Sequence, residues 1–142
     1  TFNYGLILGW TAIRGDLEII PIIFYFGAIF WTLGYDTIYG FQDIKDDEII
    51  GLKSTAIKFK GNAKKFLFLC YSFLIILFAS GGYYMNLNLS YYILGSIPLI
   101  HLLFYQMKNF NCTDPSSCLS VFKSNNMFGL IVFLNILIAK SF

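Results

Sequence analysis

Residues 35–57 read YDTIYGFQDIKDDEIIGLKSTAI and place acidic side chains at the end of a long apolar run. In one continuous helix, Asp36, Asp43 and Asp47 stand at positions i, i+7 and i+11, so all three point the same way. Carboxylates held this close repel one another, and a bound cation relieves that repulsion. Oxygen ligands in this number suit Mg²⁺, which enzymes hold with a few carboxylates and substrate phosphates. The segment therefore predicts a membrane-embedded site for a phosphate-bearing substrate.

The composition places the chain in a membrane. Of its 142 residues, 57% are hydrophobic and 13% are charged, against about 25% charged residues in a soluble domain. The fold class we expect is an all-α bundle of transmembrane helices. The formal charge of +2 is too small to indicate nucleic-acid binding. The cysteines at positions 70, 112 and 118 follow no metal or redox spacing, so we interpret them as unpaired thiols.

Apolar runs predict four complete or nearly complete membrane helices, over residues 17–41, 66–81, 91–107 and 122–139. Pro98 is a candidate kink in the third of them. A shorter run over residues 2–13 is expected to be the tail of a cut helix, because a span needs roughly 20 residues. Since Thr1 is not a methionine and lies next to an apolar run, we expect residues 1–142 to be the C-terminal part of one longer domain.

Lysines predict which way the helices face. The segment over residues 42–65 carries six lysines, and Lys108 and Lys123 belong to the same side. The opposite side has Arg14, with Lys140 at the terminus. Because short loops rich in lysine stay on the inner side of a membrane, we expect the Asp-rich loop to face the cytoplasm or the mitochondrial matrix. We expect this membrane to be a bacterial or mitochondrial inner membrane.

Charged residues around this loop allow both plain and functional interpretations. Asp46 and Glu48 fit solvated charges at a helix end, whereas Asp36 lies one to two turns inside an apolar run. Ionisable groups at such depth are costly and indicate function. Lys53 is either an ordinary anchor at the membrane surface or, beside a metal and carboxylates, a charge that neutralises a pyrophosphate oxygen.

Several uncharged polar residues are also candidates. Tyr35 and Tyr39 are one turn apart and form either helix packing or the wall of a substrate cavity. Asn125 opens the last span, where it either bonds to another helix or acts as an active-site amide. Ser54 is a candidate helix cap or phosphate donor. His101, the single histidine, is expected to be a packed, hydrogen-bonded residue rather than a ligand.

Three motifs in residues 35–57 carry a family resemblance. The segment closely resembles the second aspartate-rich region of the UbiA superfamily of intramembrane prenyltransferases. Within it, YDTIY, QDxxDD and IGxKSTA resemble the 4-hydroxybenzoate polyprenyltransferase branch, and FKSNNMFGL, residues 122–130, is similar to the last helix of that branch. The resemblance covers essentially the whole chain and implies the C-terminal half of a nine-helix fold.

The resemblance also implies roles for individual residues. The metal-binding DxxxD of the family falls on Asp43 and Asp47 and implies Mg²⁺, while Asp36 and Lys53 match characteristic branch positions and are assigned catalytic roles. It implies substrate contacts for four residues: Tyr35, Tyr39, Asp46 and Asn125. Gly40 stands where the family would have alanine. The first aspartate-rich motif of the family is nowhere in this sequence, so we expect the other half of the metal site from a missing N-terminal half.

The activity implied is Mg²⁺-dependent transfer of a polyprenyl group from polyprenyl diphosphate to the ring of 4-hydroxybenzoate, in ubiquinone biosynthesis. These 142 residues alone are expected to insert into the lipid bilayer without catalysing. Two alternatives stay open. One is a related prenyltransferase with another aromatic acceptor. The other is a transporter fragment in which Asp36 and its neighbours form a cation path, although the polar groups gather at one membrane face.

Overall fold

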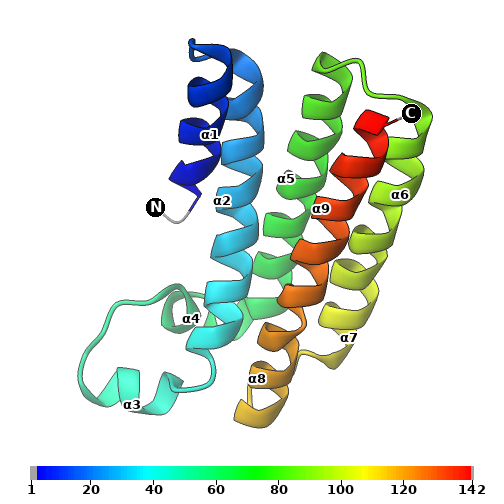
Figure 1. Cartoon of the computed structure of the whole chain (residues 1–142). Coiled ribbons are helices and arrows are strands. Elements are labelled where there is room, and N and C mark those ends of the chain that lie inside the picture. Colours follow the sequence, from blue (N-terminus) through cyan, green and yellow to red (C-terminus); the bar gives the residue numbers. More distant parts are fainter. Residues whose placement is uncertain (1–2, 142) are drawn as a thin grey trace.

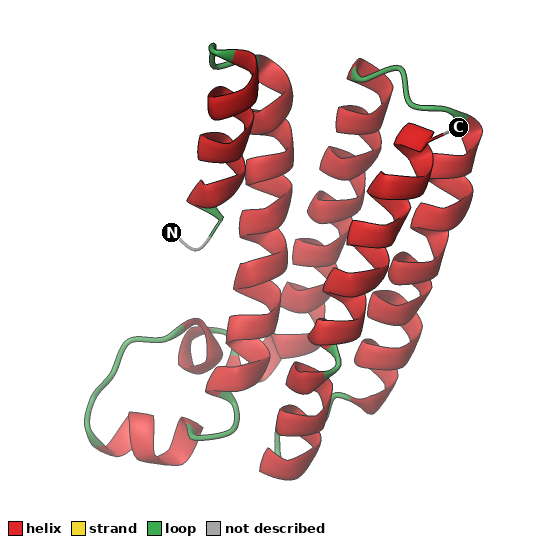
Figure 2. Ribbon diagram, in the orientation of Figure 1, coloured by secondary structure: helices red, strands yellow, loops and turns green. Residues whose placement is uncertain are grey.

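The computed structural model describes residues 3–141, and the elements found there are helices. The long ones run alongside one another (Figure 1): α1 (Tyr4–Arg14), α2 (Ile19–Gly40), α5 (Ala63–Tyr84), α6 (Leu89–Ile100) and α9 (Asn125–Ser141). The short ones are α3 (Ile44–Ile49), α4 (Thr55–Lys58), the 3-10 helix η1 (Lys60–Asn62), the π-helix η2 (His101–Gln106), α7 (Met107–Asn109) and α8 (Pro115–Lys123). Figure 2 shows how little of the chain is left to loops.

Three helical stretches are long and apolar enough to cross a membrane: Ile19–Gly40, Lys60–Tyr84 and Pro115–Ala139. They confirm the expected all-α membrane bundle. The chain is therefore an integral membrane protein. The short run expected over residues 2–13 forms α1, except that Thr1 and residue 2 lie outside the described part of the chain.

The expected span over residues 91–107 is not one α-helix. It consists of α6, η2 and α7 in direct succession. Pro98 lies inside α6, close before η2 begins at His101. Proline has no N–H to donate and its ring crowds the carbonyl of residue 94, so one bond of the regular hydrogen-bond ladder is missing inside α6. The irregularity thus follows the predicted kink residue.

Glycines and aromatic rings fit together between α2 and α5. A Cβ atom at Gly34 would lie 2.9 Å from the Tyr71 ring, and one at Gly81 would lie 2.7 Å from the Phe24 ring. Small residues let membrane helices approach closely, which substitutes for a hydrophobic driving force between them. The two helices are held side by side in this way, and the loop that joins them emerges at one end of the bundle (Figure 1).

Buried side chains at both ends anchor this loop, residues 41–62. Phe41 and Ile44 are buried, and the ring of Phe41 meets that of Phe110 at 5.5 Å. Ser54 accepts a hydrogen bond from the backbone N–H of Ile57, which confirms the expected helix cap. Between these anchors α3 lies away from the bundle (Figure 1).

Candidate functional site

The acidic residues do not share one continuous helix, so the alignment of Asp36, Asp43 and Asp47 expected from their spacing is wrong. Asp36 belongs to α2, which ends at Gly40. Phe41 then turns its side chain into the core, and Asp43, with non-helical φ −115° and ψ 18°, precedes α3. Burial of Phe41 together with the weak helix preference of glycine ends the helix before the polar residues begin.

Asp43 and Asp47 still lie together at the start of α3. The backbone N–H of Asp47 donates to the carbonyl of Asp43 at 3.0 Å, one helical turn away, and that of Asp46 donates to the same carbonyl at 3.0 Å. Residues four apart are neighbours on a helix surface. The Asp43 and Asp46 side chains are exposed and that of Asp47 is half-buried. The DxxxD pair therefore forms a small acidic surface on α3.

No basic side chain in the described part of the chain forms an ion pair with this acidic surface. Ion pairs in the described part of the chain join Arg14 to Glu18 and Lys60 to Glu48. The Lys60 to Glu48 pair links α3 to η1, with an Nζ to Oε1 distance of 2.7 Å. The carboxylates of the DxxxD pair are thus left with uncompensated charge, which a divalent cation would compensate.

The donor set fits Mg²⁺ in kind, because it consists of carboxylate oxygens. It is incomplete in number. Within residues 3–141, no three His, Cys, Asp or Glu side chains converge on a point where a metal ion could bind. Further oxygen ligands would have to come from phosphates, water or other protein segments. A metal site at Asp43 and Asp47 therefore stays a prediction of the resemblance.

An aromatic wall, made of Trp31, Tyr35, Tyr39, Phe122 and Phe128, lines the same end of α2. Its ring centroids lie 4.9 to 5.9 Å apart along the series, in edge-on and tilted arrangements. Tyr39 is 46% exposed, so the wall is open at this end. Such spacings are favourable for contacts between aromatic rings.

Asp36 is exposed on α2 beside this wall. It precedes Tyr39 by three residues, and side chains three apart are neighbours on a helix surface. Asp36, which the sequence places one to two turns inside the apolar run, is thus a neighbour of Tyr39 on the surface of α2.

Asn125 forms hydrogen bonds with two residues of the aromatic wall. Its Oδ1 accepts a hydrogen bond from Trp31 Nε1 at 2.9 Å, and its Nδ2 donates to the carbonyl of Phe122 at 3.0 Å. The expected bond between helices is confirmed, since it joins α2 to α9. The amide is engaged on both sides within the protein, so a substrate contact by Asn125 stays a prediction.

Lys53 lines an open hollow with Ser54, Thr55 and Lys58. The Thr55 hydroxyl lies 2.7 Å from that of Thr37, which fixes the hollow against α2. Two exposed lysines beside hydroxyl groups form a place suited to an anionic group. The structure therefore adds Lys58 to the predicted Lys53.

Sequence reasoning missed three residues of the site: Trp31, Phe122 and Lys58. Trp31 precedes Tyr35 by four residues and Tyr39 by eight, so helical spacing alone would place it on the same face. Phe122 carries no such signal because its helix packs against α2 from far along the chain.

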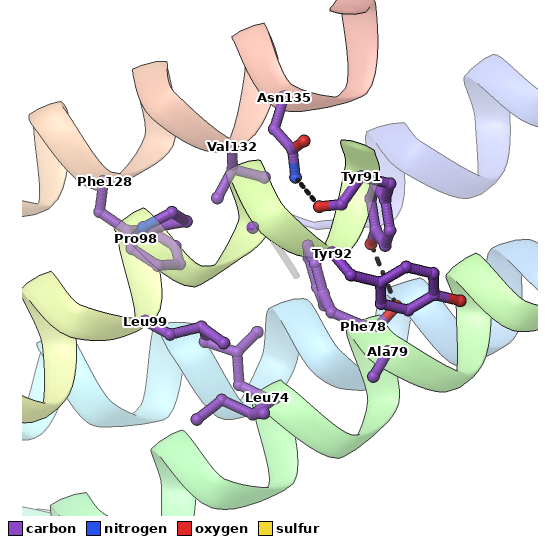
Figure 3. A pocket seen from close by; sticks show the side chains of 12 residues that line it. Leu74, Phe78, Ala79, Tyr91, Tyr92, Pro98, Leu99, Phe128, Val132 and Asn135 are labelled. Atoms are coloured by element: carbon purple, nitrogen blue, oxygen red, sulfur yellow. Dashed lines mark hydrogen bonds between the residues drawn. The ribbon is translucent and has the colours of Figure 1, made fainter. Parts of the chain in front are cut away.

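A second cavity opens between α5, α6 and α9, away from the acidic loop (Figure 3). It encloses about 520 Å³ including its mouth, and apolar side chains such as Leu74, Phe78 and Val132 line it. Within it, Asn135 Nδ2 donates to the carbonyl of Tyr91 at 3.1 Å. The residues predicted to form the functional site all lie elsewhere.

Comparisons with known proteins identify relatives of the whole described chain. The 4-hydroxybenzoate polyprenyltransferase of human mitochondria is 39% identical over 142 residues, and those of Bos taurus and Dictyostelium discoideum are each 38% identical. These alignments cover 98–99% of this chain but 30–38% of the relatives' length. No solved structure matches the chain.

The family comparison covers nearly the same residues. The sequence model of the UbiA prenyltransferase family matches residues 1–136, which include the acidic surface, the hollow at Lys53 and the aromatic wall. The chain belongs to the UbiA prenyltransferase family.

Proposed function

We propose that this chain is the C-terminal part of an intramembrane enzyme that transfers a polyprenyl group from its diphosphate to the ring of 4-hydroxybenzoate, a step of ubiquinone biosynthesis. The observation that carries the proposal is the pair Asp43 and Asp47, side by side at the start of α3 and without an ion-pair partner among residues 3–139. The relatives' names support the choice of substrates.

The acidic surface and the hollow contact the diphosphate in different ways: the first through a metal ion, the second directly. Asp43 and Asp47 would hold Mg²⁺, with further ligands from the N-terminal half, and the bound ion supplies Lewis acidity toward the departing diphosphate. Lys53 and Lys58, which line the hollow, would neutralise phosphate oxygens as point charges. Asp46, exposed on the same helix, is proposed to contact the substrate.

The aromatic wall is proposed to hold the two organic groups. The allylic C–O bond breaks and its electron pair leaves with the diphosphate, while a ring carbon beside the acceptor hydroxyl forms the new C–C bond. The faces of Tyr35, Tyr39 and Phe122 would stabilise positive charge on the allylic carbon through their ring quadrupoles. Asp36 would orient the acceptor hydroxyl or take the ring proton, whose loss restores aromaticity.

A membrane location suits this substrate. Each buried CH₂ of a polyprenyl tail favours lipid over water by about 0.8 kcal/mol, so the tail already resides in the bilayer. The lysines of the 42–65 segment support an orientation with the acidic loop at the cytoplasmic or matrix face of an inner membrane.

The test uses the full-length protein in lipid nanodiscs. We expect geranyl diphosphate to bind more tightly with Mg²⁺ than with EDTA, and 4-hydroxybenzoate to be the best acceptor in a panel of phenols and naphthols. Equal affinity with and without Mg²⁺ would overturn the metal assignment. Preference for another aromatic ring would replace the acceptor, and cation flux without prenyl binding would favour a transporter.

A further inference from the structure

A buried hydrogen-bond network joins α5, the π-helix η2 and the junction between α8 and α9. The Tyr71 hydroxyl donates to Gln106 Oε1 at 2.5 Å, and Gln106 Nε2 donates to Ser124 Oγ at 3.1 Å. His101 Nε2 lies 3.2 Å from the same Ser124 oxygen. Tyr71 and Gln106 are almost wholly inaccessible to solvent. Polar groups buried in this way are costly unless every partner is present.

Ser124 is the hub of this network. Its hydroxyl donates its one hydrogen to the carbonyl of Val121 at 2.6 Å. The Ser124 oxygen must therefore accept from both Gln106 and His101, which places a hydrogen on His101 Nε2. The His101 ring also stacks on Tyr105 with centroids 5.0 Å apart. The expectation of a packed, hydrogen-bonded histidine is confirmed.

The π-helix explains how two donors reach one oxygen. His101 and Gln106 are five residues apart, and in an α-helix they would stand about 140° apart around the axis. The i to i+5 bonding of a π-helix brings such residues onto nearly the same side. Both can then face Ser124.

The network ends at the aromatic wall. Ser124 separates α8 from α9, and its neighbour Asn125 bonds to Trp31 on one side and to the Phe122 carbonyl on the other. The Phe122 ring in turn lies 4.9 Å from that of Tyr39. The angle at this junction thus decides where the Phe122 ring lies.

We propose that Ser124 is a positioning residue, which receives the bonds from His101 and Gln106 and thereby orients Phe122 against Tyr35 and Tyr39 to fit the aromatic acceptor. The idea rests on the proposed function, because it assigns the acceptor ring to this wall. The competing explanation is that the network only stabilises the contact between helices.

Kinetics of the full-length enzyme separate the two explanations. We expect Ser124→Ala to raise the KM for 4-hydroxybenzoate at least about fivefold, the loss of about one hydrogen bond, with the KM for prenyl diphosphate within about twofold. Ser124→Thr keeps the hydroxyl and should restore the acceptor KM. Tyr71→Phe removes a hydrogen bond at the far end and should lower thermal stability without changing the acceptor KM.

An unchanged acceptor KM in Ser124→Ala, or equal changes in Ser124→Ala and Tyr71→Phe, would overturn the proposal. A second measurement needs no activity. In a background without other cysteines, Tyr39→Cys and Phe122→Cys should be joined efficiently by a short bis-maleimide, and adding Ser124→Ala should lower the yield by at least about half. An unchanged yield would also overturn the proposal. Absence of prenyl transfer in the wild type would refute the proposed function alone.

Discussion

The interface between α2 and α5 and the loop that connects them are built by opposite rules. In the interface, aromatic rings fill the space left by glycines, and Tyr71 is fully buried. In the loop, carboxylates and lysines are mostly exposed, and one ion pair, Lys60 to Glu48, is found among its described residues. The interface is therefore held by its own contacts, whereas the loop carries exposed charges, most of them without an ion-pair partner among the described residues. Changes in the two regions should affect different properties.

The largest effect should follow loss of a loop carboxylate. In the full-length protein, we expect Asp43→Ala or Asp47→Ala to lower Mg²⁺-dependent prenyl transfer by about 100-fold or more, because a ligand that compensates transition-state charge is lost. Thermal stability and membrane insertion should stay unchanged, since these side chains make no ion pair. The measurement is turnover beside a melting curve. Asp16→Ala, at the opposite end of α2, is the matched control, and near-normal turnover in either loop variant would contradict the prediction.

Filling a glycine of the interface should instead destabilise the fold. A Cβ at Gly34 meets the Tyr71 ring at 2.9 Å, so Gly34→Val should cost about 1–3 kcal/mol of stability through overpacking. Thermal denaturation in nanodiscs measures this loss. Gly9→Val on α1 is the control, because nothing lies within 4 Å of its added Cβ. Equal melting temperatures for the two variants would show that the interface is looser than the rings indicate.

Removing the hydrogen bond between Trp31 and Asn125 tests how much this bond contributes to the stability of the aromatic wall. Trp31→Phe leaves Asn125 Oδ1 without its donor, and buried acceptors without partners cost about 1–3 kcal/mol. A double-mutant cycle with Asn125→Leu should give a coupling energy of about 1 kcal/mol in unfolding experiments. Strict additivity of the two changes would mean that the bond contributes nothing.

The smallest effect should come from the ion pair of the loop. Glu48→Gln removes its ion pair with Lys60, but both side chains are well exposed, at 39% and 55%. Exposed pairs contribute roughly 0–1 kcal/mol, and salt screens them. We expect a melting temperature within about 2 °C of the wild type and no difference at high salt. A larger loss would show that the loop is held more rigidly than its exposure implies.

Much of the bundle could be predicted from the sequence because lipid selects long apolar runs, and such runs are visible without knowing the fold. The end of α2 could not, since it depends on burial of Phe41 against Phe110, far along the chain. The expected span over residues 122–139 does not include the start of α8, at Pro115. Its signal was present: Asp114 caps the helix by accepting from the Ser116 N–H, and Pro115 occupies the first turn.

The candidate site shows the same division. Asp43 and Asp47 could be found from a local motif, because their spacing of four residues does not depend on where the preceding helix ends. The aromatic wall could be found only in part. Tyr35 and Tyr39 lie on one helix, but Phe122 reaches them through contacts between distant segments, which spacing does not encode.

The π-helix marks a place where this protein can change its length at low structural cost. Removal of one residue from a regular α-helix rotates the parts on either side by about 100° relative to each other. Removal of one residue between His101 and Gln106 would instead let the segment return to α-helical winding, with these two residues four positions apart and about 40° apart around the axis. Both could still face Ser124, so we expect relatives to differ in length here more readily than inside the regular helices.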